Sequence, residues 1–164
     1  MLRARVITCS DSAFQGERAD ESGPAVRDLL IRHGFSVDDV LVIPDDEAAL
    51  ESTLLETIDR DGVGLVITTG GTGIAPRDVA PEVTIRVAPR VIPGFGELMR
   101  LRSLEKTPMA PLSRAQASCR GTSLVINVPG NPRGAVENLE AVLHLIPHAL
   151  ELLGGDRIQS HPSA

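Results

Sequence analysis

Short apolar runs alternate along the chain with longer segments in which apolar residues recur at every third or fourth position. The short runs are rich in β-branched residues and predict buried strands, whereas the longer spacing predicts amphipathic helices. The expected strands are 5–9, 37–43, 65–69, 115–119 and 122–128. The expected helices are one from Ser22 to Gly34, three over 47–60, 79–87 and 94–104, and a last one from Pro132 that Pro147 either kinks or restarts.

The order of these elements predicts the fold. Strand, helix, strand, helix, strand over the first 69 residues is typical of a parallel sheet with helices on both faces. The last two strands flank Arg120-Gly121, which favours one antiparallel hairpin. We therefore expect a three-layer α/β/α fold with a mostly parallel central sheet and one hairpin-paired strand. A length of 164 residues suits one domain, which we place at 1–155, followed by a loosely held tail at 156–164.

Charge and composition exclude several classes of function. Lys and Arg number 16 against 22 Asp and Glu, so the net charge is −6, and aromatic residues make up only 2%. Nucleic-acid binding ordinarily needs a basic surface and aromatic stacking. No apolar run approaches the roughly 20 residues of a membrane span, and the N-terminus resembles a first strand more than a signal peptide. Cys9 and Cys119 lack metal-ligand spacing and suit buried thiols. We therefore expect a cytoplasmic protein that binds neither nucleic acid nor membranes.

Small and acidic residues follow each predicted parallel strand. In open α/β sheets the ligand binds beyond the carboxyl ends of the strands, so these residues should converge on one edge. The candidates for substrate and phosphate binding at this edge are Ser10, Asp11, Thr69, Gly70, Gly71, Thr72, Gly73, Pro129, Gly130, Asn131 and Pro132.

The Gly70–Gly73 turn is the most informative of these segments. Glycines let the backbone approach a ligand closely, and successive amides form a concave nest for anions. The turn is not a P-loop, because no Gly-Lys-Ser/Thr follows it. It is not a dinucleotide fingerprint either, because it follows the third strand and Pro76 stands where a third small residue would be needed. A tight turn without a ligand remains the alternative.

Asp45 and Asp78 are the candidate catalytic carboxylates and the candidate metal ligands. Mg²⁺ is usually held by one or two carboxylates together with substrate phosphates, and two aspartates beside an anion nest suit that arrangement. Each has a structural alternative as the N-cap of the helix that follows it. Asp46 also competes with Asp45 for the same role.

Three arginines stand in or beside the same segments, Arg77, Arg114 and Arg133. A guanidinium binds phosphate through two parallel hydrogen bonds, so each is a candidate phosphate ligand. The alternative for each is an ordinary solvated arginine.

Several stretches, taken in order, resemble the molybdopterin-binding family of molybdenum-cofactor biosynthesis proteins, and within it the bacterial molybdopterin adenylyltransferases. The set spans nearly the whole chain and is specific as a set, although each stretch alone is weak. The matching stretches are Ser10-Asp11 through Asp20-Glu21-Ser22-Gly23-Pro24, Ile43-Pro44-Asp45, Thr68 to Gly73 with Arg77 to Glu82, Ile92 to Glu97, Leu112-Ser113-Arg114, and Asn127 to Pro132.

The resemblance implies a function. In that family, with Mg²⁺ as cofactor, AMP passes from ATP to the terminal phosphate of molybdopterin, giving adenylyl-molybdopterin and pyrophosphate. It implies that Asp45 and Asp78 are the essential acidic residues, that Gly70–Gly73 helps to hold the pterin, and that Ser113 and Arg114 belong to the substrate site. It also implies a homotrimer, and a downstream molybdenum-insertion enzyme is a possible partner. The alternatives are a non-catalytic molybdopterin carrier of the same family and a scaffold with no small-molecule ligand.

Overall fold

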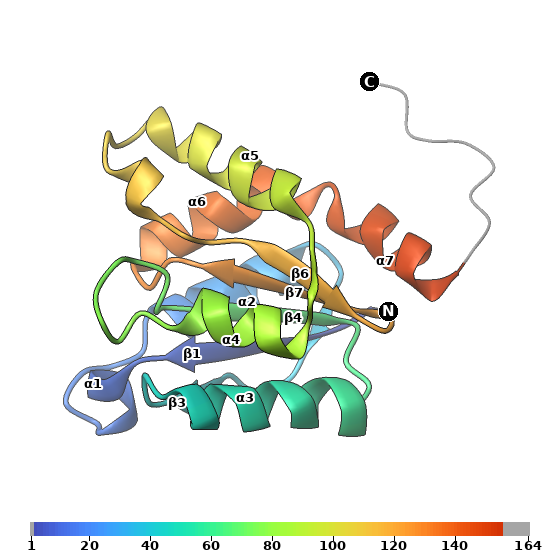
Figure 1. Cartoon of the computed structure of the whole chain (residues 1–164), viewed down its shortest axis with the longest axis horizontal. Coiled ribbons are helices and arrows are strands. Elements are labelled where there is room, and N and C mark those ends of the chain that lie inside the picture. Colours follow the sequence, from blue (N-terminus) through green and yellow to red (C-terminus); the bar gives the residue numbers. More distant parts are fainter. Residues whose placement is uncertain (1, 156–164) are drawn as a thin grey trace.

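The computed structural model describes residues 2–155. Helices and strands alternate through most of this range (Figure 1). The strands are β1 (Arg3–Cys9), β2 (Ser36–Val37), β3 (Leu41–Ile43), β4 (Leu65–Thr69), β5 (Arg90–Val91), β6 (Ala117–Arg120) and β7 (Ser123–Val128). The helices are α1 (Asp11–Phe14), α2 (Ser22–Arg32), α3 (Glu47–Leu55) with a π-helical extension η1 (Glu56–Arg60), α4 (Ala80–Val87), α5 (Pro93–Leu104), the 3₁₀ turn η2 (Ala110–Leu112), α6 (Pro132–Leu143) and α7 (Ile146–Gly154).

The strands form one mostly parallel sheet in the order β2-β1-β4-β7-β6-β5, with β3 paired to the carboxyl half of β1. β1, β2, β3, β4 and β7 run in one direction. β6 pairs antiparallel with both β7 and β5. The expected α/β/α class with a hairpin-paired strand is confirmed, and the hairpin is β6–β7.

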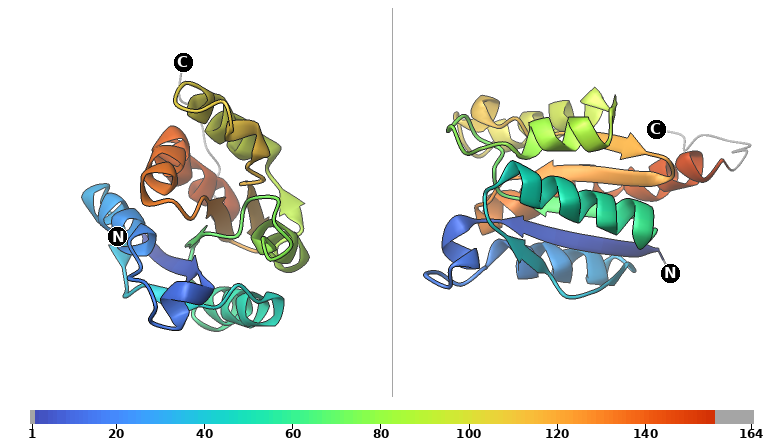
Figure 2. Two further views of the ribbon diagram at one scale, coloured as in Figure 1. Left: turned by 90° about the vertical axis from the view of Figure 1, so that its left-hand side faces the viewer. Right: turned by 60° about the horizontal axis from the view of Figure 1, so that its bottom comes forward.

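Two helical layers cover the sheet, as Figure 2 shows from the end and from below. α2, α5, α6 and α7 pack on one face, where Val6, Ile67 and Ile126 are fully buried. α3 and α4 pack on the other, against Val66 and Val125. Side chains of β1, β4 and β7 alternate between these two cores because successive strand residues point to opposite faces. Helices cover both faces of the sheet, which explains why these strands are nearly continuous apolar runs.

One expected strand is wrong. The segment 37–43 is two short strands, β2 and β3, which pair with the two halves of β1. Asp38 lies between them, and its carboxylate pairs with the guanidinium groups of Arg3 and Arg5. Aspartate is depleted in strands, and Asp38 lies outside the sheet, where it forms ion pairs with these two arginines.

The other differences are small. α1, β5 and η2 were not expected, and each is at most four residues long. The helix from Pro132 does not kink at Pro147 but stops and restarts, which was one of the two expected outcomes. It ends at Leu143, and Pro147 occupies the first turn of α7, where its missing N–H costs nothing. Cys9 and Cys119 are free and buried, as expected. None of the helices over residues 2–155 has the length and apolar character needed to cross a bilayer. The tail predicted at 156–164 lies outside the described residues.

Candidate functional site

The carboxyl ends of β1, β3, β4 and β7 meet at one edge of the sheet, on the left in Figure 1. The loops that leave these ends surround a cavity of about 570 Å³. It is lined by Thr8, Cys9, Ser10, Ala13, Arg18, Ala19, Asp20, Glu21, Ser22, Asp45, Gly70, Gly71, Asp78, Gly130, Asn131 and Pro132. We refer to it as the aspartate cavity. The structure thus brings together residues from all four loops that were expected to converge.

Gly70 lies against the backbone at the end of β1. Its φ is +98°, and a Cβ built there would lie 2.3 Å from the carbonyl oxygen of Cys9. The Gly70 N–H donates to the Val128 carbonyl (N···O 3.1 Å), and the Thr69 hydroxyl donates to the Pro129 carbonyl (2.8 Å). These two donors therefore fasten the glycine turn to the end of β7.

A second glycine completes this close packing. A Cβ on Gly130 would come within 3.2 Å of the Cα of Gly70, so the loops after β4 and β7 are in backbone contact. Gly71 follows with φ +65°, and its carbonyl accepts from the first N–H of α4 (3.1 Å). Only residues without a side chain permit this approach.

Asp45 and Asp78 both line the aspartate cavity, and each has one carboxylate oxygen anchored to backbone. Oδ2 of Asp45 accepts from the Asp11 N–H (3.0 Å), and Oδ2 of Asp78 accepts from the Ala75 N–H (2.9 Å). Within the part of the chain that the structure describes, the other oxygen of each accepts no hydrogen bond. Each aspartate therefore keeps an oxygen for a ligand.

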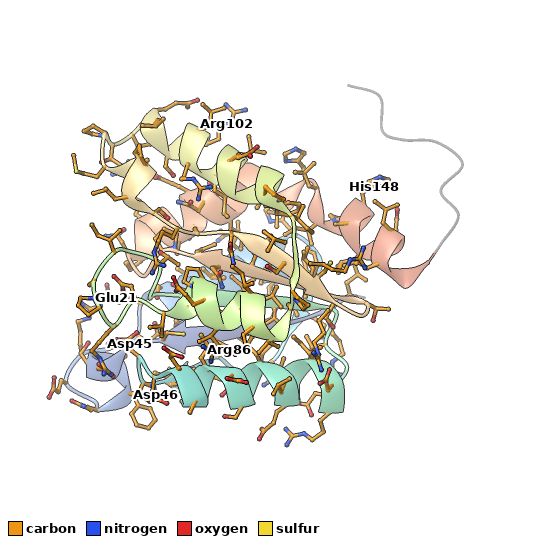
Figure 3. The ribbon with its side chains drawn as sticks, in the orientation of Figure 1. Glu21, Asp45, Asp46, Arg86, Arg102 and His148 are labelled. Carbon is orange, nitrogen blue, oxygen red and sulfur yellow. The ribbon has the colours of Figure 1, made fainter. Side chains whose placement is uncertain are left out.

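Neither aspartate is a helix cap. The N-cap of α3 is Asp46, whose Oδ1 accepts from the Ala49 N–H (2.8 Å). The N-cap of α4 is Val79, and no side chain caps that helix. Asp46 therefore caps α3, whereas Asp45 lines the aspartate cavity. Figure 3 shows the two side by side near α1.

The surroundings of Asp45 shift its pKa upward. Burial raises the pKa of Asp45, and the like charges of Asp11 and Asp78 raise it further. The Asp11 N–H and the charge of Arg77 act in the opposite direction. Burial also raises the pKa of the Cys9 thiol to about 12, helped by the charge of Asp45. Cys9 is therefore a neutral thiol at physiological pH and not a nucleophile.

The charged residues of the cavity lining are four acidic ones, Asp20, Glu21, Asp45 and Asp78, and one cation, Arg18. Two carboxylates that face one cavity suit a hard divalent cation that also takes oxygens from a substrate and from water. Among residues 2–155 no cluster of three or more His, Cys, Asp or Glu side chains is suited to hold a metal ion. The residues present therefore fit a Mg²⁺ that takes its remaining ligands from phosphate and water, and not a Mg²⁺ that is enclosed by protein ligands alone.

Ser10 and Asp11 are held in the loop after β1. The Ser10 hydroxyl caps α1 by accepting from the Ala13 N–H (3.2 Å). The carboxylate of Asp11 accepts two hydrogen bonds from the Arg77 guanidinium and one from the Asp45 N–H. Asp11, expected as a substrate-binding residue, lies beside Asp45 with its carboxylate occupied by protein donors.

The expected phosphate-binding arginines are likewise engaged within the protein. Arg77 pairs with Asp11, and Arg133 pairs with Glu137 (2.9 Å). Arg114 donates from its backbone to the Thr72 carbonyl (2.8 Å) and from Nε to the Gly73 carbonyl (2.7 Å). Its terminal nitrogens bind the Asp78 carbonyl and the Glu82 carboxylate. Arg114 thereby joins both ends of the loop that carries Asp78.

A second cavity, of about 410 Å³, adjoins the first. It lies between α5, η2 and α6, and Ser113, Pro129 and Asn131 are among its lining residues. Asn131 lines both cavities, and its Oδ1 caps α6 by accepting from the Gly134 N–H (3.0 Å). The remaining expected residues, Thr72 and Gly73, lie in the loop between Gly71 and Asp78, where Thr72 is buried.

Asp20 is a site residue that sequence reasoning did not select. Its carboxylate accepts from the Thr8 hydroxyl (2.8 Å), the Ser22 hydroxyl (3.3 Å) and the Gly23 N–H (3.1 Å). It thus ties β1 to the start of α2 at the wall of the cavity. An aspartate two or three residues before Ser-Gly-Pro is a helix-start signal, and that signal indicates the role that Asp20 plays.

Known proteins resemble this chain over most of its length. Residues 5–148 match a family described as a probable molybdopterin binding domain. The chain is 40% identical over 156 residues to a molybdopterin adenylyltransferase of Helicobacter pylori, covering 94% of this chain and 89% of that one. It is 38% identical over 176 residues to that of Escherichia coli K12, covering 98% and 90%. The crystal structure of the molybdopterin biosynthesis enzyme MoaB from Thermus thermophilus matches with a TM-score of 0.89 at 47% identity, covering 95% and 98%.

Proposed function

The chain belongs to the molybdopterin-binding family of molybdenum-cofactor biosynthesis proteins, and we propose that it transfers AMP from ATP to the terminal phosphate of molybdopterin. The observation that carries the proposal is the pair of aspartates. Asp45 and Asp78 face one acidic cavity, each with one anchored oxygen and one open to a ligand. The names of the two bacterial adenylyltransferases support the same reaction.

The reaction joins two phosphates. An oxygen of the molybdopterin phosphate forms a bond to the α-phosphorus of ATP, the bond from that phosphorus to the bridging oxygen of the β-phosphate breaks, and pyrophosphate leaves with the electron pair. A phosphate monoester has a second pKa near 6, so its attacking oxygen is largely ionised at pH 7 and requires no general base. The protein therefore has to position the phosphates and compensate their charge.

Asp45 and Asp78 would hold Mg²⁺, which supplies positive charge beside the reacting phosphates. Asp11 and Ala75 orient the two carboxylates through their N–H groups, so little reorganisation is needed when the metal and nucleotide bind. Gly70 and Gly130 let the loops after β4 and β7 pack closely against β1 and against each other beside these carboxylates. We assign substrate binding to the loops that contain these glycines, including Thr69, Gly71, Thr72 and Gly73, and to Ser10 and Pro132.

The second cavity supports a two-substrate reaction. Because Asn131 lines both cavities, ligands in the two would meet beside it. We assign Ser113, Pro129 and Asn131 to the binding of a substrate there, and Arg114 to the loop between the cavities. The family resemblance further suggests a homotrimer and a downstream molybdenum-insertion enzyme as partner. Sedimentation tests the homotrimer, and transfer of labelled product to the second enzyme tests the partner. A cytoplasmic location stays a prediction.

The test is pyrophosphate release by the purified protein with Mg-ATP and freshly prepared molybdopterin. We expect release that requires molybdopterin and that falls about 100-fold or more in Asp45→Asn and Asp78→Asn, because each loses a charge worth several kcal/mol at the metal. Asp46→Asn is the matched control and should retain the wild-type rate. Molybdopterin binding without pyrophosphate release would make the protein a carrier. Failure to bind either substrate would make it a scaffold.

A further inference from the structure

Asp11 and Arg77 connect the two aspartates of the site. The main chain and carboxylate of Asp11 form a reciprocal pair with those of Asp45, since each N–H donates to the other carboxylate at 3.0 Å. The Arg77 guanidinium forks onto the same Asp11 carboxylate, with Nε and Nη2 each 2.9 Å from an oxygen. Asp11 thus orients Asp45 from one side and holds Arg77 from the other.

Arg77 lies in the same closed turn as Asp78. The Asp78 N–H donates to the Ala75 carbonyl (2.9 Å), and the Ala75 N–H donates back to Asp78 Oδ2 (2.9 Å). These two hydrogen bonds hold the Asp78 carboxylate in a fixed place relative to the turn that contains Arg77. The fork from Arg77 to Asp11 joins the side chains of this turn to the loop after β1, and it spans 66 positions in the sequence.

We propose that Asp11 and Arg77 are positioning residues that set the spacing between the Asp45 and Asp78 carboxylates, and with it the affinity of the site for a divalent cation and its nucleotide. This inference rests on the proposed function, because it concerns the same two carboxylates. Groups that orient metal ligands typically change metal affinity or activity about 10- to 100-fold when they are removed. The Asp11–Arg77 pair is partly exposed, with side-chain exposures of 36% and 64%, so we expect an effect of about tenfold.

Arg86 offers a matched control. It also forks onto carboxylates of a neighbouring element, those of Glu47 and Glu51 at 2.8 and 2.9 Å, and its side chain is 48% exposed. It joins α4 to α3 and does not line the aspartate cavity, and Figure 3 shows it between those two helices. Arg86→Gln therefore removes a comparable ion pair without touching either aspartate.

The experiment is calorimetric titration with Mn²⁺ and the ATP analogue that has a methylene group between its α- and β-phosphates, which binds without reacting. Asp11→Asn and Arg77→Gln should each weaken binding about tenfold, and the double variant should be no weaker than either alone, because the two residues act through one contact. Arg86→Gln should bind like the wild type. In turnover assays the half-saturating Mg²⁺ concentration should rise in both variants while KM for molybdopterin stays the same.

The outcomes separate this inference from the proposed reaction. A large loss in Arg77→Gln with none in Asp11→Asn would overturn it, because Arg77 would then bind phosphate directly. Three other results would overturn it as well. The losses in affinity could be additive in the double variant, both single variants could bind as tightly as the wild-type protein, or the wild-type protein could bind no nucleotide. Normal wild-type binding without pyrophosphate release would overturn only the proposed reaction, and the binding constants of the variants would still decide the role of the pair.

Discussion

Substituting Gly70 by alanine tests whether the glycine turn is held as tightly as its geometry indicates. The residue has φ +98°, a conformation that costs an L-residue about 1–2 kcal/mol. The new Cβ would lie 2.3 Å from the Cys9 carbonyl oxygen, so β1 or the turn must shift, and such overpacking costs about 1–3 kcal/mol. The sum is about 2–5 kcal/mol, a large part of the roughly 5–15 kcal/mol that stabilises a typical domain.

Thermal unfolding measures this cost. At roughly 2–4 °C per kcal/mol for a domain of this size, Gly70→Ala should lower Tm by about 4–20 °C. Gly121→Ala is the control, since Gly121 has φ +54° but nothing within 4 Å of its Cβ position. In Gly121→Ala only the unfavourable backbone conformation contributes, so Tm should fall by about 2–8 °C. If Gly70→Ala were no less stable than Gly121→Ala, the close approach to Cys9 would not constrain the turn, and the packing argument would be refuted.

Three further predictions concern the charged residues of the site. Asp46→Ala should cost about 1 kcal/mol in urea unfolding through loss of the helix cap, yet leave pyrophosphate release unchanged. Because burial raises the pKa of Asp45, its ionisation opposes folding. Metal-free Asp45→Asn should therefore be more stable than wild type at pH 7, with the difference in urea unfolding vanishing as pH falls toward 3.8. Arg114→Gln should lower stability by about 1–3 kcal/mol and reduce kcat, because the loop carrying Asp78 loses its attachment. Unchanged stability with a raised KM would instead make Arg114 a substrate ligand.

The fold and the location of the site follow from local sequence rules. Strands such as β4 and β7 are apolar on both faces because helices cover both, and their order along the chain implies a parallel sheet. Parallel strands then bring their carboxyl ends, and the polar residues after them, to one edge. The break between β2 and β3 was not predictable in this way, since it depends on Asp38 meeting Arg3 and Arg5 across the surface.

Local rules could not decide which polar residues are free to bind a ligand. Asp45 and Asp46 are adjacent and chemically equal, and only the course of the chain into α3 makes one a cap and the other a cavity residue. Similarly, nothing near Arg77 in the sequence indicates Asp11 as its partner, 66 positions away. Such pairings are properties of the assembled loops.

The internal pairing of these arginines bears on how the reaction can work. Two phosphate-bearing substrates would meet at an edge where Arg77, Arg114 and Arg133 are already paired with protein groups. The cavity lining carries four acidic residues and one cation, Arg18, so its net charge repels polyanions. In the proposed reaction the compensating charge would arrive with the nucleotide, and the cation would then take part in substrate recognition as well as in catalysis. It follows that free ATP should bind far more weakly than its Mg²⁺ complex, and that Asp45→Asn should narrow this difference by weakening only the binding of the complex.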